Sequence, residues 1–242
     1  MATAAPRQPN ILFVLTDQWR GDCLSLTGHP VVETPVLDMM GRQGVVFTRA
    51  YAACPSCIGA RACLMTGTTP STNGRIGYED CVPWRYETTL MGELGRGRYQ
   101  CHCVGKTHFY PQRIGLGFHS IESYECLQNH DRDYVNDYYA WLSVQPGGPW
   151  DENVHGLDSN SWAARPSPLP EHLHVNAWTV TRSIEFLKRR DPTRPFFLNV
   201  SFHRPHPPND PPSEYFHMYD RAELPPVPMG QWAAEYDRPV DN

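Results

Sequence analysis

Residues 53–67 read ACPSCIGARACLMTG, and the chain is organised around this stretch. Ser56 is a residue type that caps the start of helices, and Gly67 is a type that ends them. Between them, apolar side chains recur at the i, i+4 and i+7 positions of a helix, namely Ile58, Ala62 and Met65. The pattern predicts a short helix with Cys57 in its first turn.

The start of this helix favours a bound anion, because unpaired backbone N–H groups and the positive end of the helix dipole converge there. The same environment is expected to lower the pKa of the Cys57 thiol. Arg61 lies one turn further on the same face and adds a fixed positive charge. A nucleophile in this position suits attack on a sulfuryl or phosphoryl centre. The alternative is that Cys57 is a small buried apolar residue, as most free cysteines are.

The spacing of Cys57 and Arg61, followed by LeuMetThrGly at 64–67, resembles the sulfatase signature Cys-x-Pro-x-Arg ahead of Thr-Gly. This resemblance implies that a formylglycine-generating enzyme oxidises Cys57 to formylglycine before folding, and that the hydrate of the aldehyde is the nucleophile. The sequence departs from the signature at Gly59, which stands in place of proline, and Ala60 precedes the arginine. The modifying enzyme reads the proline and the arginine, so the departure bears on the conversion of Cys57.

Residues 11–16, ILFVLT, form a continuous apolar run that is typical of a strand buried on both faces. Asp17 and Gln18 follow, at the strand end where open α/β sheets place ligands. Without the other motifs, Asp17 would be interpreted as a helix cap or turn residue. Sulfatases usually have two aspartates here that bind a divalent metal. The resemblance therefore implies a metal at Asp17, Gln18 and modified Cys57, with Ca²⁺ favoured over Mg²⁺ or Mn²⁺.

Two later predicted strands also end in residues whose side chains could bind a substrate or transfer a proton. Residues 99–105 predict a short strand ending at Lys106-Thr107-His108, and alternation puts Lys106 and His108 on one side. The pair resembles the sulfatase motif Gly-Lys-x-His, where lysine holds the sulfate and histidine acts on the hydrate. Residues 196–202 predict a buried strand that leads into a Pro-His-x-Pro segment. His206 matches the sulfatase histidine that protonates the leaving group, whereas the neighbouring His203 is more suited to a structural role.

Further elements follow from caps and periodicity. A helix is predicted to start at Thr34-Pro35 and to end at Gly44, followed by a strand over 45–51 and a helix over 88–94. A helix from Asp131 is expected within a loop-rich insertion over 119–170. A longer helix is predicted by apolar residues in a 4-3-4-3 spacing, namely Leu173, Ala177, Val180, Ile184 and Leu187.

The composition excludes several classes of protein. The chain has 242 residues with a net charge of −5, and its pI near 6.1 gives no general attraction to nucleic acid or to an anionic membrane. No apolar run is long enough to span a membrane, and the amino terminus has no signal-peptide core. The eight cysteines are sparse and show no second pair at zinc spacing, so a reducing cytoplasm is the expected compartment.

We therefore expect an α/β fold, an alkaline-phosphatase-like and mostly parallel sheet flanked by helices. Residues 1–242 are interpreted as the amino-terminal portion of a single sulfatase-like domain with the insertion at 119–170. Sulfatases complete the metal site with a later strand ending in Asp-Asn or Asp-His, followed by a further lysine. No such element follows His206, so the fold is expected to be incomplete and to require a missing carboxy-terminal half.

The expected reaction is hydrolysis of a sulfate ester of a small molecule. Arg61 and Lys106 would stabilise charge on the nucleophile and the sulfuryl oxygens. His206 is the candidate acid for the leaving alcohol, and His108 is the candidate base that lets the covalent sulfate collapse.

Two alternatives stay open. Gly59-Ala60 and the Asp-Gln-Trp-Arg segment at 17–20 suggest a phosphonate monoester or phosphodiester hydrolase of the same superfamily, since that segment resembles the phosphonate monoester hydrolase and choline-sulfatase-like branches. The other alternative is a non-catalytic anion-binding protein or an inactive truncated relative. Such a protein would bind an anion without turnover.

Overall fold

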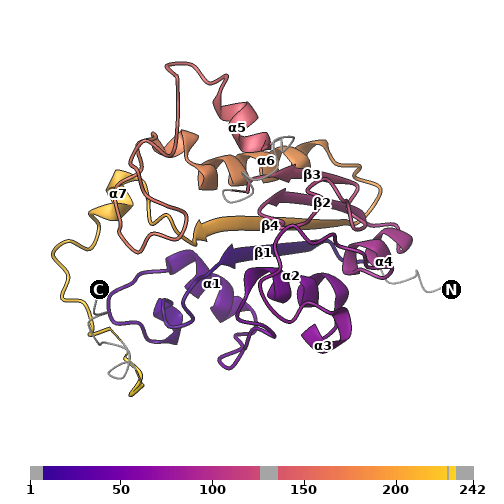
Figure 1. The fold of residues 1–242 in the computed structure, drawn as a ribbon, viewed down its shortest axis with the longest axis horizontal. Coiled ribbons are helices and arrows are strands. Elements are labelled where there is room, and N and C mark those ends of the chain that lie inside the picture. Colours follow the sequence, from indigo (N-terminus) through magenta and orange to yellow (C-terminus); the bar gives the residue numbers. More distant parts are fainter. Residues whose placement is uncertain (1–7, 126–135, 228, 233–242) are drawn as a thin grey trace, which may run out of the picture. The chain divides into compact units, whose positions relative to one another are not determined.

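A computed structural model describes residues 8–125, 136–227 and 229–232. The described strands form one parallel sheet with the order β1-β4-β2-β3 (Figure 1). The strands are β1 (Ile11–Asp17), β2 (Gln100–Gly105), β3 (Ser120–Ser123) and β4 (Phe196–Pro205). This arrangement confirms the predicted parallel sheet.

The chain divides into two compact units. The larger unit comprises residues 1–19 and 49–217 and contains the sheet, and the smaller comprises 20–48 and 218–242. The smaller unit contains α1 (Pro35–Gln43) and the 3₁₀ helix Ser25–Thr27, so the predicted helix that Gly44 ends is confirmed.

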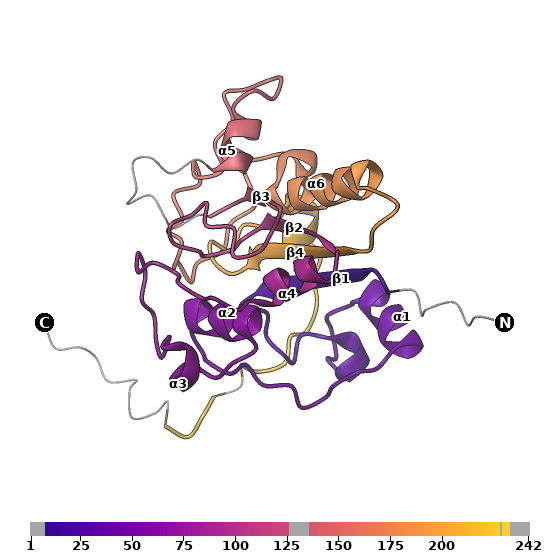
Figure 2. The ribbon, with the colours of Figure 1, turned by 90° about the vertical axis from the view of Figure 1, so that its right-hand side faces the viewer.

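Helices cover both faces of the sheet in the larger unit. On one side lie α2 (Cys57–Thr66), α3 (Pro70–Asn73) and α4 (Leu90–Arg96), and on the other lie α5 (Asp137–Leu142) and α6 (Val175–Arg189) (Figures 1 and 2). A 3₁₀ helix (Glu171–Leu173) precedes α6, and α7 (Ser213–Phe216) follows β4. A parallel sheet with helices on both faces confirms the predicted α/β fold class.

Two apolar clusters hold these layers together. Ile58 and Met65 of α2 pack with Phe197 on one face of β4, and Trp178 of α6 packs with Leu198 on the other. Successive residues of a strand point to opposite faces, so β4 contributes to both clusters. The predicted inward positions of α2 are confirmed, and Gly67 ends the helix in the left-handed conformation with φ 68°.

The prediction that residues 11–16 are buried on both faces is wrong. Leu12 and Val14 are 55% and 52% exposed. Among the described strands β1 pairs only with β4 and forms one end of the sheet order. A continuous apolar run therefore does not distinguish a central strand from one at the edge.

One other local prediction is also wrong. Residues 45–51 form no strand, and Val45 and Phe47 are largely exposed, because β-rich sequence pairs only where a neighbouring strand is available. The predicted longer helix is confirmed as α6, although its buried residues include Trp178 and Ser183, whereas Val180, Ile184 and Leu187 are exposed.

The remaining helix predictions are confirmed in part. The helix expected over 88–94 is α4, whose N-cap Thr89 accepts a hydrogen bond from Gly92 N. The helix expected from Asp131 falls partly on residues 126–135, outside the described residues, and α5 begins at Asp137. Across the described parts of the chain, no helix combines the length and apolar character needed to cross a membrane.

Candidate active site

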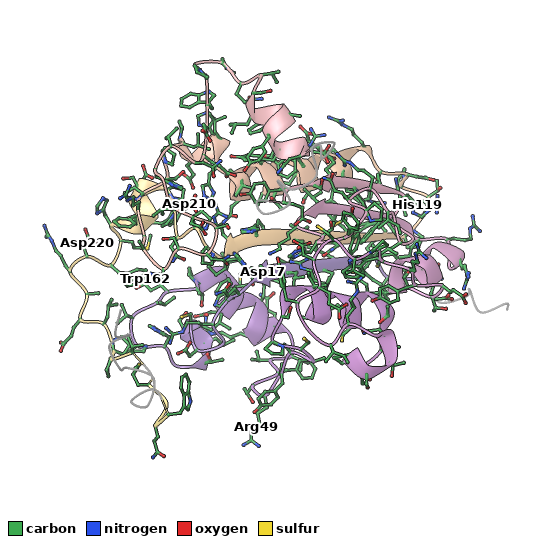
Figure 3. All side chains as sticks on the ribbon, in the orientation of Figure 1. Asp17, Arg49, His119, Trp162, Asp210 and Asp220 are labelled. Atoms are coloured by element: carbon green, nitrogen blue, oxygen red, sulfur yellow. The ribbon has the colours of Figure 1, made fainter. Side chains whose placement is uncertain are left out.

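The candidate site lies where three parallel strands end. Asp17 ends β1, Lys106 follows β2 directly, and Ser201 lies towards the end of β4. Figure 3 labels Asp17 at this position on the ribbon. The carboxyl ends of parallel strands meet at one edge of a sheet, so side chains far apart in the sequence are brought together. Arg61 of α2 reaches the same place.

Asp17 is the acidic centre of this cluster. Its Oδ2 lies 2.8 Å from Lys106 Nζ and accepts a hydrogen bond from Arg61 at 3.1 Å. Burial opposes ionisation of Asp17, but the positive charges of Lys106 and Arg61 outweigh it and hold its pKa below the usual value. Asp17 is therefore ionised at neutral pH, and one carboxylate faces two cations.

Arg61 is buried and links the three strand ends. It donates to the carbonyl oxygen of Lys106 at 2.7 Å and to Ser201 Oγ at 3.0 Å, in addition to its bond with Asp17. Its side chain is only 3% exposed. The sequence indicated Arg61 as an anion-holding group, and the structure adds a packing role. Ser201 was missed, because a serine within an apolar strand gives no signal of its own.

Cys57 is half-buried at the first position of α2, as predicted. Ser56 occupies the N-cap position, but its side chain makes no capping hydrogen bond. Burial raises the pKa of the Cys57 thiol despite the opposing charges of Lys106 and Arg61. The expectation of a lowered thiol pKa is therefore wrong, because the loss of water around the sulfur outweighs the helix end and the cations.

Gly59 has a steric reason to be glycine. A Cβ atom at this position would lie 2.6 Å from Sγ of Cys54 and 3.1 Å from the carbonyl oxygen of Arg75. Cys54 is 4% exposed, and its sulfur has little room to move away. The departure from the signature proline thus coincides with a close approach of the Cys54 sulfur to Gly59.

Lys106 and His108 are both buried, at 1% and 2% exposure. Neither ring nitrogen of His108 has a hydrogen-bond partner within the part of the chain that the structure describes. The His108 ring packs edge-on against the Tyr78 ring, with 5.9 Å between the ring centroids, and His108 Nε2 lies 4.0 Å from Oδ1 of Asp80. Burial, with the charges of Lys106 and Arg61, lowers the pKa of His108 to about 3. The imidazole is therefore neutral at pH 7.

His206 lies just beyond β4 and is 8% exposed. Its Nδ1–H donates to the carbonyl oxygen of Pro207 at 2.9 Å, which fixes the tautomer and leaves Nε2 as the second ring nitrogen. The ring packs against His203 at 4.7 Å. Burial and the charge of Lys106 lower the pKa of His206, so it is largely neutral in the free site. An anionic substrate would oppose that shift.

A buried ion pair supports the histidine segment. Arg204 Nε donates to Asp210 Oδ1 at 2.6 Å and its NH2 donates to Oδ2 at 2.9 Å. Another Arg204 nitrogen lies 2.8 Å from Nδ1 of His203, and His155 Nε2 lies 3.3 Å from Asp210. Figure 3 shows Asp210 on the segment beyond β4. This ion pair was not predicted, although Arg204 lies between His203 and His206 in the sequence.

A divalent metal is predicted at Asp17, Gln18 and Cys57. One oxygen of Asp17 is engaged by two cations, and Gln18 is exposed with a left-handed φ of 59°. Over residues 8–125, 136–227 and 229–232, no three His, Cys, Asp or Glu side chains are grouped to hold a metal ion. Ca²⁺ takes about six to eight oxygen ligands. The described residues therefore do not fit a complete metal site, and the metal stays a prediction.

Comparison with known proteins gives one family. The family model described as Sulfatase matches residues 9–237. An arylsulfatase of Clostridium perfringens (strain 13 / Type A) is 44% identical over 240 residues, which cover 95% of this chain and 50% of the relative. A multifunctional alkaline phosphatase superfamily protein of Trinickia caryophylli is 27% identical over 244 residues, covering 89% of this chain and 45% of the relative.

Among solved structures, the phosphonate monoester hydrolase of Agrobacterium radiobacter is similar with a TM-score of 0.72 and 26% identity. The match covers 93% of this chain and 46% of that chain. The similarity confirms the predicted alkaline-phosphatase-like architecture. The chain spans about half the length of the relatives it matches.

Proposed function

Because this chain belongs to the sulfatase family, we propose that it carries the nucleophile and cationic half of a site that hydrolyses a sulfate ester of a small molecule. The observation that supports this most directly is the cluster around Asp17. Two buried cations, a cysteine at a helix start and a neutral histidine surround one strand end. Such a cluster suits a tetrahedral anion that is attacked and then released.

The nucleophile is proposed to be an oxygen on modified Cys57. The raised pKa of the unmodified thiol makes a thiolate unfavourable at neutral pH, which supports an oxygen nucleophile over sulfur. Oxidation of Cys57 by a formylglycine-generating enzyme would supply an aldehyde hydrate, whose oxygen can form a bond to sulfur. Lys106 would then balance negative charge on the sulfuryl oxygens, while Arg61 holds Lys106 and Asp17 in register.

Two histidines would move the protons. The attacking hydroxyl would lose its proton to water as the oxygen–sulfur bond forms. The anionic substrate favours protonation of His206 at Nε2, because Nδ1–H is held by the Pro207 carbonyl, and Nε2 would give that proton to the alcohol oxygen as its bond to sulfur breaks. His108 would take the proton of the hydroxyl that remains on residue 57, so that sulfate leaves and the carbonyl reforms. Its ring nitrogens have no hydrogen-bond partner among the described residues and its imidazole is neutral at pH 7, which leaves a nitrogen lone pair available for this proton. No step here depends on the predicted metal.

A second candidate is hydrolysis of a phosphonate monoester or phosphodiester. The solved phosphonate monoester hydrolase supports it, as does Gly59 in place of the signature proline. Tetrahedral sulfuryl and phosphoryl anions bind the same cations, so kinetics must separate them. Comparison of kcat/KM for an aryl sulfate and an aryl phosphonate distinguishes the candidates, and absence of turnover on both, with anion binding retained, supports a binding protein.

The state of Cys57 tests the proposal. The chain should be co-expressed with a formylglycine-generating enzyme, and the peptide that spans Cys57 should be weighed by mass spectrometry. Formylglycine is expected at Cys57 and an intact thiol at Cys63, the matched control in the same helix. An intact thiol at Cys57 would overturn the oxygen nucleophile and identify Gly59 as the obstacle.

A partner segment and a cellular compartment are also proposed for this chain. We expect a complementary carboxy-terminal half to complete the site, because the curated relatives are about twice as long. A reducing cytoplasm is proposed because the eight cysteines of the sequence are sparse for a secreted disulfide scaffold.

A further inference from the structure

We propose that Glu125 is a positioning residue that holds the Lys106-Thr107-His108 turn in the shape the reaction needs. The inference rests on the proposed function for its catalytic consequence, but its structural part stands on contacts alone. Glu125 lies just after β3, which pairs in parallel with β2. The turn after one strand is thus held by a side chain from the next.

Three donors converge on one oxygen of Glu125. Oε1 accepts hydrogen bonds from the backbone N–H of Thr107, from the backbone N–H of His108 and from Thr107 Oγ1, the last at 2.9 Å. Two consecutive backbone N–H groups that point at one place form a concavity that binds anions. Here a carboxylate of the same chain fills it, so the concavity is closed to a substrate anion.

The turn has an unusual backbone that such contacts must hold. His108 adopts φ 60°, a left-handed conformation that non-glycine residues rarely take. Gly105, at the end of β2, has φ 100°, and a Cβ atom there would lie 2.0 Å from the carbonyl oxygen of Ser201. Lys106 lies between these two positions, and its ammonium is 2.8 Å from Oδ2 of Asp17. Backbone strain of this kind persists where surrounding contacts determine it.

Glu125 is itself fixed and buried. Its side chain is 3% exposed, and Asn136 Nδ2 donates to its carbonyl oxygen at 3.2 Å. Burial raises the pKa of Glu125, while the Lys106 charge and the His108 N–H oppose the rise. A buried carboxyl group without hydrogen-bond partners would destabilise the fold. Its contacts go to the backbone of the turn, which is the group it can position.

The test uses Glu125→Ala and Glu125→Gln, because glutamine keeps an acceptor oxygen of the same reach. Glu122→Gln is the matched control, since Glu122 lies in β3 but pairs with Arg182. Amide hydrogen exchange, measured by NMR on the unmodified chain, reports the turn without any activity. In Glu125→Ala, exchange at Thr107 and His108 should rise about tenfold or more, the factor expected for loss of one strong hydrogen bond.

Glu125→Gln should restore most of that protection, and Glu122→Gln should leave both amides unchanged. Unchanged exchange in Glu125→Ala, or an equal rise across the whole sheet, would overturn the positioning role. In an assay of the aryl ester, Glu125→Ala should lower kcat/KM by about a hundredfold through misplacement of Lys106 and His108. Full kcat/KM with disturbed exchange would also overturn it. If the wild type lacks turnover even with its carboxy-terminal half present, the proposed function fails, and the exchange data still decide the role of Glu125.

Discussion

The guanidinium of Arg61 donates to the main-chain carbonyl oxygen of Lys106 at 2.7 Å, so one buried cation holds the backbone of another. The Lys106 ammonium and Arg61 then share Oδ2 of Asp17. The planar guanidinium of an arginine has several N–H donors and can bind a carbonyl, a hydroxyl and a carboxylate at once, whereas the single ammonium of a lysine cannot. The geometry of the site therefore depends on arginine at position 61.

Arg61→Lys should impair both folding and turnover. The loss of the bonds to Lys106 and Ser201 leaves buried acceptors unpaired, so the free energy of unfolding should fall by roughly 2–4 kcal/mol. Urea unfolding measures it, with Arg42→Lys as the control, since Arg42 is 70% exposed. If Arg61→Lys loses kcat/KM but keeps full stability, the linking role is wrong and an anion-holding role alone remains.

Gly59→Ala should be destabilising, and a smaller residue at position 54 should relieve it. The new Cβ would meet Cys54 Sγ at 2.6 Å, and overpacking of this kind lowers stability by about 1–3 kcal/mol. In Gly59→Ala with Cys54→Ala, the combined loss should be smaller than the sum of the single losses. Gly77→Ala is the control, because no atom lies within 4 Å of its added Cβ. Strictly additive losses would contradict the steric coupling.

Acid should destabilise the protein through His108. Its folded pKa is about 3 against an ordinary 6.5, so between these values the unfolded chain binds a proton that the folded chain does not. Stability from this group is therefore lost as the pH falls from 6.5 towards 3, by at most about 1.4 kcal/mol per pH unit.

Urea unfolding at several pH values measures this effect. His108→Asn should show a shallower fall in stability below pH 6.5 than the wild type. His172→Asn, which changes an exposed imidazole, is the matched control. Parallel curves for the wild type and His108→Asn would show that this histidine is not held neutral by burial.

Lys106→Met should raise the pKa of the Cys57 thiol further. The Lys106 charge opposes the effect of burial on this thiol, so its removal should raise the pKa further. The pH dependence of alkylation, followed by mass spectrometry of the Cys57 peptide, measures the change. Lys188→Met, at an exposed position, is the control. An unchanged pKa would mean that Lys106 does not act on residue 57.

Local motifs predicted where the candidate site residues lie in the fold, because each of them follows a strand or starts a helix. Asp17, Lys106 and His206 lie at the ends of three parallel strands, and parallel strands end at one edge. Order along the chain was enough to bring them together. The contacts that hold them were not predictable, because Ser201 and Glu125 carry no motif and act only through neighbours distant in sequence.

The same distinction explains the errors. Residues 11–16 and 45–51 have strand-like sequences, but the position of a strand in a sheet is decided by its partners. The thiol pKa of Cys57 was expected to fall from the helix end alone, whereas burial by the surrounding fold raises it. Both errors arose where a long-range quantity, pairing or desolvation, outweighed a local one.

By itself the sequence determined the parallel α/β architecture, the helix that begins at Cys57 and the identity of the chemically able residues, because periodicity, caps and motifs are local. Only the tertiary structure decided that Arg61 links three strand ends, that Gly59 is set by Cys54, and that His108 is held neutral. The physical reason is that burial, charge pairing and steric contact depend on which residues meet across the fold, and spacing along the chain does not specify them.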